Sequence, residues 1–111
     1  MQRAGLGLDL GTTTSLASIV DSRGRPEVVS GPVGRHLIPS AIYFDANIVV
    51  GESALELGLR DPEGLAEAFK RDIGKPHYSR EIRSTQVPPE VLTGFLIRHL
   101  LANVRSHCGD V

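Results

Sequence analysis

The stretch that decides the fold is residues 6–20, which read LGLDLGTTTSLASIV. Two short apolar runs, 6–10 and 15–20, are rich in strand-forming residues, and a glycine followed by three threonines separates them. This arrangement predicts a β-hairpin. A polar turn follows, and residues 27–30 then have the composition of a third strand. The first thirty residues therefore predict an antiparallel meander.

The middle of the chain changes from strand patterns to helical ones. Glycine and proline residues at 31–39 predict a connection, and residues 40–44 and 48–50 predict two more strands. From Ser53 the apolar residues recur at helical spacing, until Asp61-Pro62 ends the pattern. We expect a first subdomain at 1–38 and a second at 39–111.

Two further helices and a loop are predicted beyond Pro62. Leu65, Phe69 and Ile73 would form the apolar face of a short helix, and residues 75–87 are polar and without period, which is typical of a loop. The long helix opens at Pro88-Pro89-Glu90 and has a broad apolar stripe, which comprises Val91, Leu92, Phe95, Leu96, Ile97, Leu100, Leu101 and Val104. The predicted fold class is mixed α/β.

Composition limits the possible functions. The chain has 111 residues, 12 of them basic and 13 acidic, so it is one small, nearly neutral domain without the positive field that holds nucleic acid or an anionic membrane. Its single cysteine, Cys108, cannot form an internal disulfide. The apolar N-terminal run is interrupted by Asp9 and is too short for a signal sequence or a membrane span. We expect a cytoplasmic protein.

The hairpin bend carries the residues that point to chemistry. Asp9 ends the first strand, Gly11 allows close approach of a ligand to the backbone, and Thr12, Thr13 and Thr14 follow. Backbone N–H groups of a tight turn and threonine hydroxyls can hold a phosphate, and a carboxylate can organise Mg²⁺ through its water ligands. An ordinary hairpin with strand-forming threonines would have the same pattern.

Lys70 and Arg71 are candidate phosphate contacts elsewhere in the chain. They lie within the predicted helix at 65–73. Two neighbouring cations are usually a solvated surface pair, and a lysine that reaches a phosphate is the alternative.

Five segments in the same order resemble heat-shock protein 70 chaperones of the DnaK type. They cover nearly the whole chain and comprise Gly7–Ser15, Gly34–Ser40, Val50–Ala54, Phe69–Gly74 and Pro88–Glu90. The resemblance implies the opening part of an actin-like (ribonuclease H-like) ATPase domain, with an antiparallel meander and helices of its first lobe. Residue 38 is isoleucine where the family commonly has threonine, and the segment between Gly74 and Pro88 is shorter than is usual in the family.

The resemblance also implies residue roles. Asp9 would place Mg²⁺ through water, and Thr12, Thr13 and Thr14 would hold the β- and γ-phosphates of ATP or ADP. Lys70 would act catalytically by orienting the attacking water and stabilising charge on the γ-phosphate, with Arg71 in support.

A complete protein of this kind would couple ATP hydrolysis to the binding and release of unfolded peptides, with cochaperones as partners. The chain matches only the opening part of the ATP-binding domain, so we expect little ATPase activity from it alone. Exposed sheet edges and the helix stripe favour self-association. Two alternatives remain: the start of an actin-fold sugar kinase, whose phosphate turn is similar, and a non-catalytic interaction module on the same fold.

Overall fold

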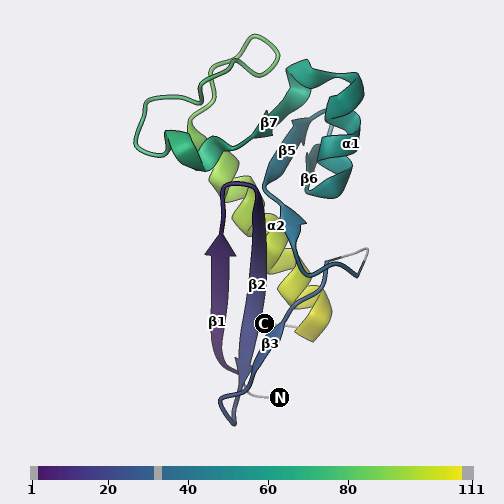
Figure 1. Ribbon diagram of the computed structural model, residues 1–111, viewed down its shortest axis with the longest axis vertical. Helices are drawn as coiled ribbons and strands as arrows, with labels where there is room; N and C mark the ends of the chain where they lie inside the picture. Colours follow the sequence, from purple (N-terminus) through teal and green to yellow (C-terminus); the bar gives the residue numbers. More distant parts are fainter. Residues whose placement is uncertain (1–2, 32–33, 109–111) are drawn as a thin grey trace.

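A computed structural model of the protein describes residues 3–31 and 34–108. Two small antiparallel sheets lie one above the other along an elongated molecule, and one long helix passes behind the first sheet and beside the second (Figure 1). The first sheet has the order β1-β2-β3, with β4 also paired to β2, and comprises β1 (Arg3–Leu10), β2 (Thr14–Asp21), β3 (Pro26–Val28) and β4 (Ile38–Pro39). The second has the order β6-β5-β7 and comprises β5 (Ala41–Phe44), β6 (Ile48–Val50) and β7 (Leu65–Glu67). The helices are α1 (Glu52–Arg60), α2 (Pro89–Cys108) and the short 3-10 helices η1 (Pro62–Gly64) and η2 (Phe69–Asp72).

The predicted hairpin is confirmed. β1 and β2 pair antiparallel, with Leu8 opposite Ala17 and Leu10 opposite Ser15. Leu8 and Leu10 pack against the core, and Ala17 and Ile19 of β2 are buried in it. Because side chains alternate along a strand, Asp9 falls on the opposite face and is exposed.

β5 is the central strand of the second sheet and is buried on both faces. Ile42 belongs to the main core, whereas Ala41 and Tyr43 pack with Ala54 of α1 in a smaller cluster. The sheet is therefore held between α1 on one side and the main core on the other.

α2 closes the core of both sheets. It begins at Pro89, where proline costs no hydrogen bond, and the N–H groups of Val91 and Leu92 donate to the carbonyl of Pro88. Its buried face consists mainly of Leu92, Leu96, Leu100 and Val104, which recur every four residues. This face packs against β2, β5, β6 and η2. In residues 3–31 and 34–108 no helix combines the length and apolar character needed to cross a bilayer.

The short helix predicted at 65–73 is wrong. Leu65–Glu67 instead forms β7, with Ala66 paired to Ile42 of β5. Ala68 then adopts a left-handed backbone, with φ of 55°, which cannot continue a helix, and the chain restarts as η2. Pairing to an already buried strand has overridden the four-residue spacing, and Ile73 is 47% exposed.

Two other predictions differ in detail. β4 was predicted as part of a connection, because two residues are too few to carry a pattern. The third strand ends at Val28 rather than Ser30, although the N–H of Val29 still donates to the carbonyl of Ala17 at 2.8 Å. The division into subdomains at 38/39 stays a prediction, and it falls within β4.

The segment 75–87 is a loop, as predicted, with one isolated bridge between Ile82 and Thr85. It is not merely a surface connection, because Tyr78, Ile82 and Val87 are buried in the main core. A few apolar anchors thus hold an irregular segment against the fold.

Gly51 and Gly94 allow a paired test of this fold. Gly51 precedes α1 at φ 93° and ψ −143°, a conformation restricted to glycine, and an added Cβ would lie 3.2 Å from Cγ2 of Ile38. We expect Gly51→Ala to lower the free energy of unfolding by about 1–3 kcal/mol. Gly94 lies on the exposed side of α2 with open space around it, so Gly94→Ala should raise the free energy of unfolding by about 1 kcal/mol.

Urea denaturation followed by circular dichroism measures both changes. A Gly51→Ala variant as stable as the wild type would contradict the backbone conformation before α1.

Candidate functional site

The turn between β1 and β2 is a tight structure that requires glycine. The N–H of Gly11 donates to the carbonyl of Thr14 at 3.1 Å, which closes the turn on itself. A Cβ on Gly11 would lie 2.4 Å from that carbonyl oxygen, closer than any real contact. Any side chain at this position would therefore force the turn open.

Polar groups are concentrated around this turn. The carboxylate of Asp9 is exposed at the end of β1, Thr13 is exposed, and Thr12 and Thr14 are half-buried. Backbone amides and hydroxyl groups of this kind suit the oxygens of a phosphate, and a single solvated carboxylate suits a cation that keeps its water ligands. In the described ranges no three His, Cys, Asp or Glu side chains gather as a potential metal site.

Two buried serines brace the turn from behind. The hydroxyl of Ser40 donates to the carbonyl of Gly11 at 2.9 Å, and its oxygen lies 2.8 Å from the hydroxyl of Ser15. The backbone N–H of Ser40 also donates to the carbonyl of Thr13 at 2.8 Å. The two serines are 25 residues apart, so nothing in the sequence indicates that they meet.

Lys70 and Arg71 project from η2, a different element. Phe69 and Asp72 at the ends of η2 are buried, whereas Lys70 and Arg71 between them are exposed. Neither cation forms a salt bridge within the part of the chain that the structure describes. Because Phe69 and Asp72 are buried, they fix the backbone of η2, and the side chains of Lys70 and Arg71 extend into solvent from a fixed backbone.

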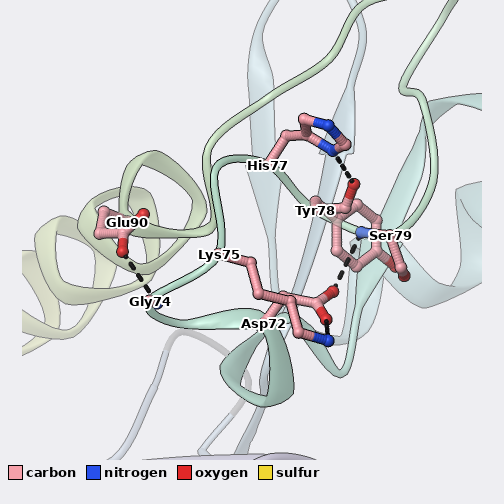
Figure 2. A network of polar contacts seen from close by, with 7 residues as sticks. All are labelled: Asp72, Gly74, Lys75, His77, Tyr78, Ser79 and Glu90. Carbon is pink, nitrogen blue, oxygen red and sulfur yellow. Dashed lines mark hydrogen bonds and ion pairs between the residues drawn. The ribbon is translucent and has the colours of Figure 1, made fainter.

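Asp72 is the centre of a polar network that fastens η2 to the chain after it (Figure 2). Its carboxylate accepts hydrogen bonds from the backbone N–H of Ser79 at 3.0 Å and from Nζ of Lys75 at 3.2 Å. The bond from Ser79, followed by Lys75, holds the pKa of Asp72 below its ordinary value, although burial acts in the opposite direction. Glu90 extends the network to α2 by accepting a bond from the N–H of Gly74 at 3.3 Å.

The predicted site residues therefore form two groups. Asp9, Gly11 and Thr12–Thr14 lie together at the hairpin turn, as their adjacency in sequence requires. Lys70 and Arg71 lie on η2, and in residues 3–31 and 34–108 no hydrogen bond or ion pair joins them to the turn. Figure 1 shows the turn and η2 towards the same, N-terminal end of α2.

A second polar cluster was also missed from sequence. Arg83 donates from its guanidinium to Oδ2 of Asp61 at 2.7 Å, to the Tyr43 hydroxyl at 3.1 Å and to the carbonyl of Phe44 at 2.8 Å. The Tyr43 hydroxyl donates to Asp61 at 2.8 Å. The hydrogen bonds from Tyr43 and Arg83 lower the pKa of Asp61, and the bond to Asp61 raises the pKa of Tyr43. The cluster fastens the 75–87 loop to β5 and to the end of α1.

A hollow of about 310 Å³ lies away from the predicted site residues. It is bordered by β4, β6, the start of α1 and His99 of α2. Burial lowers the pKa of His99 below its ordinary value and so disfavours the charged imidazolium. The hollow is mainly apolar, unlike the hairpin turn.

Comparison with known proteins places these features in a family. Residues 5–94 match the family described as Hsp70 protein. A relative described as chaperone protein DnaK, from Endomicrobium trichonymphae, is 28% identical over 111 residues, which covers 95% of this chain and 18% of the relative. The chain thus spans less than a fifth of the length of that relative.

Substitution of Gly11 tests the closure of the turn. We expect Gly11→Ala to lower the free energy of unfolding by about 1–3 kcal/mol, because backbone atoms must move to admit the methyl group. Gly5 of β1 is the matched control: it has open space around it, and Gly5→Ala should stay within about 0.5 kcal/mol of the wild type. Chemical denaturation measures both, and equal effects of the two substitutions would contradict the geometry of the turn.

Acid titration tests the Asp72 network. Because the folded-state pKa of Asp72 lies below its ordinary value of 3.8, the unfolded chain binds a proton more readily, and the stabilisation present above that value is lost as the pH falls through the folded pKa. We expect Asp72→Asn to be less stable than the wild type at pH 7, with a difference that shrinks as the pH falls below 3.8. Urea unfolding between pH 7 and pH 2 measures this, and a constant difference would contradict it.

Proposed function

The chain belongs to the Hsp70 protein family, and on this premise we propose that its β1–β2 turn holds the phosphates of ATP or ADP within an ATPase domain. The observation that carries the proposal is the turn itself, which has no room for a side chain at Gly11 and is ringed by polar groups. Family membership supports nucleotide as the ligand.

The turn residues would divide the contacts between phosphate and metal. The hydroxyls of Thr12, Thr13 and Thr14 and the amides of the turn would hold the β- and γ-phosphates. The carboxylate of Asp9 would hold Mg²⁺ through water, which suits a single solvent-exposed carboxylate. When bound, Mg²⁺ would neutralise charge on the phosphates.

Lys70 and Arg71 would act from η2. In this proposal Lys70 orients the water that attacks the γ-phosphate and stabilises the charge that develops there, and Arg71 supports it. Three observations support this role. Lys70 and Arg71 are both exposed, they lie between the buried residues Phe69 and Asp72, and among the described residues they make no salt bridge that would neutralise them. Phe69 and Asp72 keep the lysine on a rigid base.

The complete protein would hydrolyse ATP to drive binding and release of unfolded peptides, in cooperation with cochaperones. The match to the Hsp70 family over residues 5–94 favours this function over that of a sugar kinase. A non-catalytic interaction module on the same fold is distinguished by experiment, because it would not need the polar groups at the turn.

Titration of the ¹⁵N-labelled chain with Mg²⁺-ATP tests the proposal. Amide resonances report binding even at millimolar dissociation constants, so a weak site is still detected. We expect the largest shifts at residues 9–15, smaller ones at Lys70 and Arg71 of η2, and the loss of both in Asp9→Ala. Asp45→Ala, an exposed change in the β5–β6 turn, is the matched control and should keep them. No shift at the turn, or the same shifts in Asp9→Ala, would contradict the proposal.

A further inference from the structure

We propose that Ser40 is a positioning residue for the phosphate-binding turn: by engaging the turn carbonyls from inside the protein, it keeps them away from a bound anion. The inference rests on the proposed function for the identity of the anion. The geometry of Ser40 itself does not depend on it.

Ser40 contacts the turn at three points. Its hydroxyl donates to the carbonyl of Gly11, its N–H donates to the carbonyl of Thr13, and its hydroxyl oxygen meets that of Ser15 at 2.8 Å. Ser15 and Ser40 are 1% and 3% exposed, so water has little access to their hydroxyl groups. The contact between the two hydroxyls is therefore more persistent than an equivalent contact at the surface.

The direction of the carbonyls decides whether a turn can bind phosphate. A carbonyl oxygen carries partial negative charge and repels an anion, whereas N–H groups attract it. Here the carbonyls of Gly11, Thr13 and Thr14 all accept hydrogen bonds from within the protein. The amides of Thr12 and Thr13 donate no backbone hydrogen bond to another described residue. These three carbonyl acceptors are therefore occupied, and the amides of Thr12 and Thr13 can donate to a ligand, as an anion site requires.

Ser40 transmits the rigidity of the core to the turn. It lies between β4, which pairs with β2, and β5, the buried central strand of the second sheet. The backbone of Ser40 cannot shift without disturbing Ile42 and its neighbours in the main core. The turn thus takes its conformation from a residue between two strands that lies 29 positions after Gly11.

Two serine variants test the role of Ser40. Ser40→Ala removes the bond to Gly11 and the contact with Ser15, whereas Ser15→Ala, an equally buried loss of a hydroxyl, removes only the contact between the serines. Amide hydrogen exchange of Gly11, whose N–H closes the turn, is the main readout. We expect exchange to speed up about tenfold or more in Ser40→Ala beyond any change at Ile42 and Leu96, and much less in Ser15→Ala.

Nucleotide titration supplies the second readout. Ser40→Ala should lower the affinity for Mg²⁺-ATP, measured from the shifts at the turn, about tenfold. Ser15→Ala should lower it less. If Ser40→Ala does not fold, Ser40→Cys is the substitute, because a thiol has a similar volume and is a weaker hydrogen-bond donor than the hydroxyl. It should change amide exchange and nucleotide affinity in the same direction but by less.

The outcomes separate the two proposals. Exchange that rises equally at Gly11 and throughout the core, or equally in both serine variants, would overturn the positioning role of Ser40 and leave the phosphate site standing. The opposite result is also possible: the wild type shows no nucleotide shifts, while Ser40→Ala still speeds up amide exchange at Gly11 selectively. That result would overturn the phosphate site and confirm that Ser40 positions the turn.

Discussion

The buried face of α2 is the constraint on which the rest of the structure depends. Leu92, Leu96, Leu100 and Val104 form one continuous row that serves both sheets and η2. Neither three-residue strands nor a two-residue strand could bury enough apolar surface to be stable alone. Each becomes stable because it adds side chains to a core that the helix already closes. The hairpin that carries the turn and the 3-10 helix that carries Lys70 are thereby held against one rigid element.

Patterns that are local in the sequence were predictable, and those that depend on distant pairing were not. The hairpin at 6–20 and the helix after Pro88 have the right period and the right terminal residues, so their existence followed directly. The segment 65–73 has helical spacing by coincidence, and pairing of Ala66 with Ile42 overrode it. The 75–87 loop was recognised, but nothing in its polar composition marked Tyr78 or Ile82 as core residues.

The candidate site divides in the same way. Asp9, Gly11 and the threonines all lie within residues 9–14, so a motif could reveal them. Ser40 joins the turn only through three-dimensional contacts, and in the sequence it stands out only within the segment Gly34–Ser40 that carries the family resemblance. The Asp61, Tyr43 and Arg83 cluster joins three segments of the chain and had no signal in their spacing. The sequence motif thus covers the exposed residues of the turn, and the groups that support the turn lie elsewhere in the chain.

The turn and the cations of η2 are each held in place by other parts of the fold. The turn is organised before any ligand arrives, because Gly11, Thr13 and Thr14 have their carbonyls engaged by the folded chain. A phosphate would then meet amides that need no rearrangement, and binding would not have to supply the cost of ordering the turn. The cations on η2 are supported separately, through Phe69 and the Asp72 network. Since both supports lead to α2, directly or through β5, a shift of either group relative to the other requires repacking of that helix. The distance between the β1–β2 turn and Lys70 is thus set by the core, and substitutions along the buried row of α2 can alter the candidate site from a distance.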